Sequence, residues 1–326
     1  AETLLLQLFR GAGVAGLSAM PTINEFEGGW LLRPLLNVPR QHIEAYAKSN
    51  NLHWIEDPSN TNSEFDRNFI RHNVMPVLTL RWPSLMNTLS RSASHQAEAA
   101  GLLDVLAEQD YRVCKGAHQE QHTLSVSSLL QLEPARQRNI VRFWIRHVCQ
   151  LPLPDTRHLQ RILSEVLTAS EDATPLVEWH DHIRAVELRR YRDEVYVQVR
   201  AEGMPNSAAF MNQYPWDLRQ PFILPDGSSL QLEQTEGVGL KASLVGQDNI
   251  RIGFRQGGEL CRPVGRGHRH SLKKLMQEWG IPPWLRAQVP LLFVGDEIAQ
   301  VIGFCLCEPF QADSDEKGVF ISQTGI

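Results

Sequence analysis

The stretch that decides the fold of the N-terminal third is ETLLLQLFRGAGVAGL, residues 2–17. Its first nine residues have the composition and apolar spacing of a helix, and Gly11 is a natural helix end. No Ser, Asp or Asn cap precedes the helix, so we expect the chain to begin inside an element of a longer protein. The glycines at positions 11, 13 and 16 lack a Cβ, so a ligand can approach the backbone closely there.

Outward from this stretch, strand and helix patterns alternate. Residues 30–36 predict a strand and residues 40–50 a helix. A helical region beginning at Phe69 continues past position 100, and Pro76 and Pro83 are expected to interrupt it. The first third is therefore predicted to be an α/β domain.

The rest of the chain divides by its periodicity. Residues 93–167 repeat apolar side chains every three or four positions, which predicts helices, and residues 185–199 alternate like a hairpin that turns at 192–194. Residues 201–215 are rich in Gly, Pro, Asn and Ser and resemble a linker. Short strands and one helix at 271–279 follow and predict an α+β domain. The predicted division is into domains 1–90, 91–202 and 216–326, with the linker at 203–215.

Composition limits the class of protein. The chain has 326 residues, 42% of them hydrophobic, and no apolar stretch approaches the roughly 20 residues that cross a bilayer. The first nine residues lack a basic leader and a cleavage site, and the five cysteines lack the spacing of disulfides or a metal site. We therefore expect a cytoplasmic protein without a membrane segment, and we identify no metal ligands.

The net charge of −5 argues against a generally cationic surface, but it can hide a local basic face.

Two arginines, Arg67 and Arg71, stand four residues apart. On a helix both side chains would face one anionic group, such as a phosphate. They can instead be solvated or paired with Asp57, Glu64 or Asp66, and spacing alone favours this second interpretation because exposed charges are common.

Two loops also allow both a binding and a plain structural interpretation. Arg10 beside the glycine turn can hold an anion through its guanidinium and exposed amides, or the turn can simply cap the helix. The segment EDPSN, residues 56–60, can bind a ligand or form a proline turn whose side chains satisfy local backbone donors. Neither loop matches a Walker or Rossmann phosphate-binding motif.

The last domain carries a local basic segment. Between positions 251 and 286 eight cations stand against Glu259 and Glu278, a local formal charge of +6. The cations are Arg251, Arg255, Arg262, Arg266, Arg269, Lys273, Lys274 and Arg286. This predicts a face that contacts phosphates, with a solvated surface as the alternative. Ser271 is expected to cap a helix that buries Leu272, Leu275 and Trp279, while Trp284 is expected to pack in the core or at a hinge rather than in a base stack.

Ten motifs in this order resemble the bacterial tRNA(Ile)-lysidine synthetase family. They are ETLL (2–5), RGAG (10–13), GL (16–17), RPLL (33–36), EDPSN (56–60), RNFIR (67–71), RQGGE (255–259), RPVGR (262–266), SLKKL (271–275) and GIPPWLR (280–286). The resemblance extends over essentially the whole chain and is least specific in the middle.

The resemblance implies a ligase that joins free L-lysine to C2 of the wobble cytidine of tRNA(Ile) with a CAU anticodon. ATP with Mg²⁺ would first adenylate the base, which turns a poor leaving group into a good one before the lysine amine attacks. The implied fold is an α/β remnant of a PP-loop ATP-pyrophosphatase domain, then a mainly helical tRNA-binding domain and a small α+β domain for the acceptor stem.

The resemblance also implies roles for individual residues. Glu2 would recognise the lysine ammonium, with helix capping as its plain alternative, and Arg10 would join it in catalysis. The residues expected to bind nucleotide or tRNA are Gly11, Gly13, Arg67, Asn68, Arg71, Arg255, Arg262, Arg266, Lys273 and Lys274. The family's Ser-Gly-Gly-x-Asp-Ser loop, which binds ATP phosphates, does not occur in residues 1–326. We therefore expect this chain alone to be inactive, and a noncatalytic tRNA-binding module is the alternative function.

Overall fold

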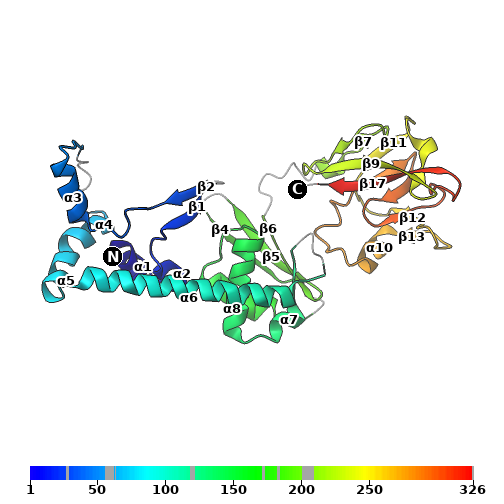
Figure 1. The fold of residues 1–326 in the computed structure, drawn as a ribbon. Helices are drawn as coiled ribbons and strands as arrows, with labels where there is room; N and C mark the ends of the chain where they lie inside the picture. The colour runs from blue at the N-terminus through cyan, green and yellow to red at the C-terminus, as the bar shows by residue number, and fades with distance from the viewer. Residues whose placement is uncertain are drawn as a thin grey trace. The chain divides into compact units, whose positions relative to one another are not determined.

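The computed structural model describes residues 1–26, 29–55, 62, 64–117, 122–170, 173–181, 184–199 and 209–324. The chain divides into two compact units, Ala1–Gln198 and Val199–Ile326 (Figure 1). Within the described ranges, no helix is long and apolar enough to cross a membrane.

The first unit begins with two helices and a hairpin. These are α1 (Glu2–Phe9), α2 (Val14–Leu17), β1 (Ile23–Phe26) and β2 (Gly29–Leu32), followed by α3 (Arg40–Ser49). The predicted helix at 40–50 is confirmed. The predicted strand at 30–36 is shorter than expected and ends at Leu32, one residue before Arg33-Pro34. Proline cannot donate a hydrogen bond to the neighbouring strand, which fits the early end of the pairing.

One continuous helical stretch follows, in three segments. They are α4 (Asp66–Phe69), the π-helical η2 (Ile70–Val74) and α5 (Met75–Arg81). The expectation that Pro76 interrupts this stretch is wrong. Met75 closes the wide turn by donating its N–H to the carbonyl of Ile70, and Pro76 then lies in the first turn of α5, where a missing N–H costs little. Pro83 does separate α5 from the next helix, as expected.

Helix α6 (Leu85–Cys114) is 30 residues long and contacts α2 and α5 as well as α7, α8 and β3 (Figure 1). Near its start, Leu85 and Leu89 pack against a small core of Leu5, Ile70 and Met75. Near its end, Cys114 enters a much larger core. The helix is continuous across position 90, where the first domain boundary was predicted, so that boundary stays a prediction.

The larger core belongs to the mainly helical middle region, which is confirmed. Its helices are α7 (Val126–Leu130), α8 (Pro134–Phe143), η4 (Trp144–Val148), α9 (Thr156–Arg161) and η5 (Ile162–Val166). Its sheet has the order β3-β6-β5-β4, with β3 at Leu124–Ser125, β4 at Leu176–His180, β5 at Ala185–Tyr191 and β6 at Glu194–Val199. The predicted hairpin is therefore β5–β6, and it turns through Arg192 in the left-handed region at φ 54°. Side chains of Ser125 and Asp155 cap α7 and α9.

The second unit is rich in strands, and α10 (Leu272–Glu278) is the single α-helix among its described residues. A five-stranded sheet has the order β16-β15-β14-β11-β7, and a four-stranded sheet the order β10-β17-β9-β8. The strands are β7 (Tyr214–Pro215), β8 (Phe222–Ile223), β9 (Ser229–Glu236), β10 (Leu240–Lys241), β11 (Ile250–Gly253), β12 (Leu260–Cys261), β13 (His270–Ser271), β14 (Leu291–Val294), β15 (Glu297–Val301), β16 (Cys305–Leu306) and β17 (Lys317–Thr324). Small β12 and β13 pair with each other.

Two details of the predicted C-terminal organisation change. Residues 203–208 of the expected linker lie outside the described residues, but Tyr214–Pro215 pairs with β11 and so belongs to the folded unit. Helix α10 buries Leu272 and Leu275 as expected, although the side chain of its N-cap residue, Ser271, makes no capping hydrogen bond within the described structure.

Candidate functional site

In the first unit, two of the predicted arginines converge on Glu2. Arg71 donates from Nε to Glu2 Oε1 at 2.6 Å and from Nη2 to Oε2 at 2.8 Å. The Nε of Arg67 lies 3.8 Å from Glu2 Oε2, and its Nη2 donates to the hydroxyl of Thr3 at 3.0 Å. The four-residue spacing does aim both guanidiniums at one anion, as predicted, but the anion in the structure is a carboxylate of α1. Asp57 lies outside the described residues, and the carboxylate that both arginines contact is that of Glu2 rather than Glu64 or Asp66.

The Glu2 carboxylate is held in its charged form. Desolvation is the strongest single influence and by itself would raise the pKa of Glu2. The hydrogen bond from Arg71 and the charges of Arg71 and Arg67 outweigh it, so the pKa lies below its ordinary value. In turn, the hydrogen bond to Glu2 raises the pKa of Arg71. Only 25% of the Glu2 side chain and 31% of the Arg71 side chain are exposed, so this pair is better shielded than an ordinary surface ion pair.

Asn68, between the two arginines, has a different setting. Its side chain is buried, and its Nδ2 donates to the backbone carbonyl of Asn62 at 2.9 Å. It therefore anchors the chain that leads into α4. The predicted EDPSN loop, residues 56–60, lies outside the described residues.

The glycine turn after α1 is a helix cap. Gly11 has a φ of 69° and donates its N–H to Leu8, while the N–H of Ala12 donates to Gln7, which is the Schellman pattern. These two amides are thus used within the cap and do not form the anion cradle that the sequence suggested. Gly13 has extended backbone at the start of α2. The Arg10 guanidinium is 67% exposed and lies 3.9 Å from the Asp66 carboxylate.

In the second unit, five of the eight cations in the basic segment have carboxylate partners. The pairs are Arg251 with Asp296, Arg255 with Glu259, Arg262 with Glu308, Arg266 with Glu278, and Arg269 with Glu297. Three of these carboxylates lie beyond position 286, outside the window in which charges were counted. Eight cations thus meet five carboxylates rather than two, and the formal charge of the group is +3 instead of +6.

The paired arginines differ in how accessible they are. Arg255 is largely buried and lies 4.0 Å from Glu259, whereas 47% of Arg262 and 39% of Arg266 remain exposed beside their partners. The hydrogen bond from Arg266 lowers the pKa of Glu278. Arg286 is buried and donates from Nε to the carbonyl of Ile281 at 2.9 Å, so it supports the chain after α10 and does not belong to a basic surface.

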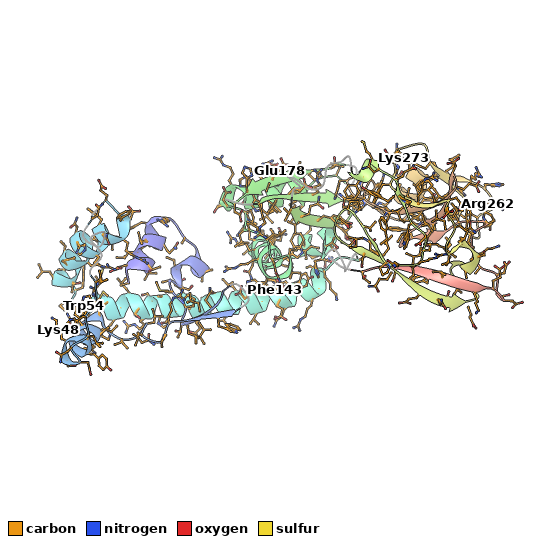
Figure 2. All side chains as sticks on the ribbon, turned by 90° about the horizontal axis from the view of Figure 1, so that it is seen from above. Lys48, Trp54, Phe143, Glu178, Arg262 and Lys273 are labelled. Atoms are coloured by element: carbon orange, nitrogen blue, oxygen red, sulfur yellow. The ribbon has the colours of Figure 1, made fainter. Side chains whose placement is uncertain are left out.

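The two lysines are the most available cations of the predicted set. Lys273 and Lys274 are both exposed on α10, and neither makes a salt bridge in the part of the chain that the structure describes. The helix directs them outward because Leu272, Leu275 and Met276 fill its buried face. Figure 2 labels Lys273, on α10, and Arg262, the residue after β12.

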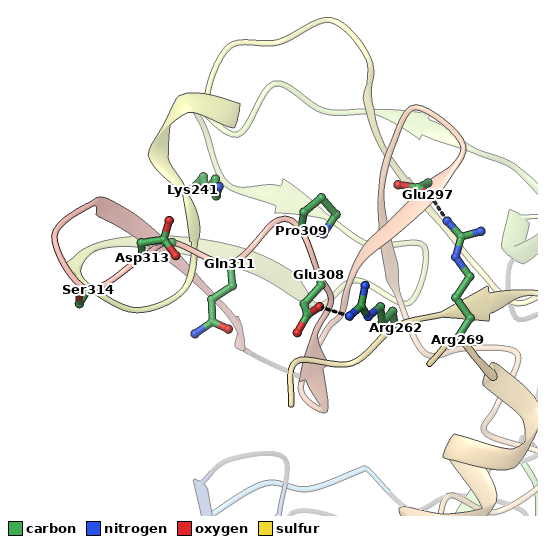
Figure 3. A pocket seen from close by; sticks show the side chains of 11 residues that line it. Lys241, Arg262, Arg269, Glu297, Glu308, Pro309, Gln311, Asp313 and Ser314 are labelled. Carbon is green, nitrogen blue, oxygen red and sulfur yellow. Dashed lines mark hydrogen bonds and ion pairs between the residues drawn. The ribbon is translucent and has the colours of Figure 1, made fainter. Parts of the chain in front are cut away.

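Arg262 also lines an open cleft of about 740 Å³ (Figure 3). Arg262 and Arg269 enter it with their partners Glu308 and Glu297, and Lys241 enters from β10. Sequence analysis missed Lys241 because it is a lone lysine outside the basic segment, and no local pattern distinguishes it. Carboxylates and cations are mixed in this cleft, so its walls do not present one sign of charge.

Three family models match separate parts of the chain. Residues 1–78 match a PP-loop domain, residues 124–196 a TilS substrate binding domain, and residues 250–322 a TilS substrate C-terminal domain. A solved structure described as the TilS C-terminal domain covers 35% of this chain and 98% of its own, with 21% identity and a TM-score of 0.29.

Curated relatives match over nearly the full chain. The tRNA(Ile)-lysidine synthase of Coxiella burnetii is 44% identical over 322 residues, which cover 98% of this chain and 68% of that protein. The tRNA(Ile)-lysidine synthase of Methylococcus capsulatus is 41% identical over 305 residues, which cover 93% of this chain and 67% of that protein. These matches show that the chain belongs to the tRNA(Ile)-lysidine synthase family.

Proposed function

We propose that this chain acts in the ATP-dependent modification of tRNA(Ile), as a tRNA-binding part of a carbon–nitrogen ligase. The name shared by its relatives supports the substrate and the reaction class, and the match to a PP-loop domain supports the use of ATP. In finer detail we propose that L-lysine is joined to the wobble cytidine of a CAU anticodon and that Mg²⁺ accompanies ATP. The noncatalytic tRNA-binding module is not favoured, because the relatives are named as synthases.

In the N-terminal site we propose a positioning role for the three charged residues. The bidentate contact with Glu2 fixes the Arg71 guanidinium, and the same carboxylate draws Arg67 toward it. An arginine oriented in this way can meet a phosphate without first losing much side-chain freedom. The lysine-binding role for Glu2 and the catalytic role for Arg10 stay predictions.

The glycine turn at residues 10–13 is not a fitted cradle for the ATP phosphates. The amides of Gly11 and Ala12 already donate to the helix end, so they are not available to phosphate oxygens. The contribution proposed for this chain is recognition of RNA and orientation of charged groups.

The observation that carries RNA recognition is the exposure of Lys273 and Lys274 on α10, free of salt bridges in the described structure. A phosphate contacting them does not have to displace a salt-bridged carboxylate. Arg262 and Arg266 rank second, because a phosphate must displace Glu308 or Glu278 first. Arg255 ranks last because Glu259 and the surrounding protein cover it.

A salt titration of tRNA(Ile) binding tests this proposal. We expect the double variant Lys273→Ala/Lys274→Ala to weaken binding and to lower the slope of log affinity against log salt by about two. Arg262→Ala/Arg266→Ala should weaken binding less. Arg219→Ala/Lys317→Ala, which removes two other exposed cations of the same unit, is the matched control and should change little. Binding that is absent, or that does not depend on salt, would refute the proposal.

A further inference from the structure

An aromatic pair in the second unit has no binding role among those described so far. Trp279 directly follows α10, and Phe304 lies in the turn between β15 and β16. Their rings stack with centroids 5.3 Å apart and planes inclined by 20°. Trp279 also packs against the core that contains Leu275, so the pair is anchored from below. Phe304 nevertheless remains 44% exposed.

The turn that carries Phe304 is tightly formed. Val301 and Cys305 are paired across the strands, and Phe304 donates its N–H to the carbonyl of Val301 at 3.0 Å. Gly303 adopts a φ of 81°, which a residue with a Cβ rarely reaches. The ring is thus presented at a fixed place, and little conformational freedom would be lost when a ligand covers it.

Positive groups lie beside both segments of the pair. Arg266 Nη1 contacts Glu278, the residue before Trp279, at 2.8 Å. The charge of Arg266 also helps to lower the pKa of Cys305, the residue after Phe304, where the hydrogen bond from Cys261 has the largest effect. The charges of Lys274 and His270 also help to lower the pKa of Glu278. These cations surround the Glu278 carboxylate, next to Trp279, and Arg266 also acts on the residue after Phe304. An open aromatic ring with a group of cations near its two segments matches a ligand that is flat and aromatic at one point and anionic next to it, and that replaces Glu278 as the partner of those cations.

A nucleotide has this combination, since a base stacks on aromatic rings and its phosphate attracts cations. Bases inside a duplex are already covered on both faces. The pair offers one open ring rather than a slot between two rings, and this suits a base at the end of a strand, whose other face stays stacked on its neighbour.

We propose that Phe304, supported by Trp279, stacks against an unpaired base at the end of a strand of the bound RNA, while Arg266 and Lys274 contact the adjoining phosphates. This inference rests on the proposed function, that the chain binds tRNA, and adds the kind of nucleotide that the second unit reads. It also assigns a role to an exposed aromatic residue that belongs to none of the predicted motifs.

The test uses the full 326-residue chain and two RNA hairpins with the same stem. One hairpin has an unpaired extension of a few nucleotides on both its 5′ and its 3′ strand, and the other ends flush. We expect the unchanged chain to bind the extended hairpin roughly tenfold more tightly. Phe304→Ala should abolish this preference while leaving the affinity for the flush hairpin unchanged, and Phe304→Trp should retain it.

Phe320→Ala is the matched control, because Phe320 is another exposed phenylalanine of the same unit, 48% exposed on β17. It should leave the preference intact, and thermal unfolding of each variant verifies its fold. Equal binding of the two hairpins by the unchanged chain, or a preference that survives Phe304→Ala, would overturn the stacking proposal and leave tRNA binding standing. Failure of the unchanged chain to bind either hairpin would instead overturn the proposed function.

Discussion

Arginines predicted to hold anions occur at both ends of this chain, and in both places they contact protein carboxylates. At the N-terminal site two arginines share the single, mostly covered carboxylate of Glu2. In the second unit Arg262 and Arg266 each have a carboxylate of their own, and all four side chains are more than a third exposed. Equal spacing in the sequence thus leads to two different kinds of site.

The difference matters because exposure decides how easily a carboxylate can be exchanged for a phosphate. An exposed ion pair contributes about 0–1 kcal/mol, so a phosphate can replace one partner at small cost. Breaking a shielded, bidentate pair costs more, because the remaining charge is left without its partner in a poorly solvated place. We therefore regard the N-terminal cluster as a fixed framework and the C-terminal pairs as exchangeable contacts.

The largest effect is expected when the shielded pair is broken. Arg71→Ala removes both hydrogen bonds to Glu2 and should lower the free energy of unfolding of the first unit by about 1–2 kcal/mol. Arg40→Ala, which removes an exposed pair with Glu44, is the control and should cost less than about 0.5 kcal/mol. Urea unfolding followed by far-UV circular dichroism measures the difference, because most helices lie in the first unit. If Arg71→Ala and Arg40→Ala lower the free energy of unfolding equally, the shielded pair is no stronger than an exposed one.

A pH titration should show a smaller effect of the same pair. The folded-state pKa of Glu2 lies below its ordinary value of 4.5, so its ion pair stabilises the fold fully above that pH. This contribution is lost as the pH falls from about 4.5 through the lowered pKa. Glu2→Gln can still accept one hydrogen bond from Arg71, so at neutral pH it should be less destabilised than Arg71→Ala. Because it lacks the titrating carboxylate, its stability should also fall less than that of the unchanged chain as the pH is lowered. Urea midpoints of the unchanged chain and of Glu2→Gln between pH 6 and pH 3 test this, and parallel curves would contradict it.

The smallest expected effect is a gain in RNA affinity. Glu308→Gln removes the partner of Arg262 and should tighten tRNA binding about two- to fivefold at low salt, the range expected for an exposed pair. Glu233→Gln removes the same charge from an exposed position on β9 and controls for overall repulsion. If both variants bind RNA equally well, the Arg262 pair does not compete with phosphate. Fluorescence anisotropy with labelled tRNA resolves changes of this size.

Local periodicity predicted much of the fold. The helices at 40–49 and 272–278 and the β5–β6 hairpin follow from apolar spacing and turn residues over a few positions. The prediction that Pro76 interrupts the helix was wrong. The π-helical turn before it ends when Met75 donates its N–H to the carbonyl of Ile70, and Pro76 then lies in the first turn of α5. That adjustment depends on the packing of Ile70 and Met75 against α1 and is not visible in a local pattern.

The candidate site was predicted less completely, because its contacts join distant parts of the chain. Glu2 and Arg71 are 69 positions apart, and the spacing of the arginines alone could not identify their shared partner. The carboxylates Asp296, Glu297 and Glu308 come from strands or turns beyond the basic segment, so a count within that segment overstated its charge. The stacking of Trp279 on Phe304 likewise depends on tertiary structure.

Helix α6 has a consequence of another kind. Its first turns pack beside Leu5 and Ile70, next to the Glu2 cluster, and its last residue lies in the core of the middle region. Thirty helical residues extend about 45 Å, and a helix resists compression along its axis. The helix therefore fixes the distance between the two cores that it joins in the first unit. A ligand that contacts both ends of α6 at once must present its two contact points at that separation, so the length of α6 would limit the size of such a ligand.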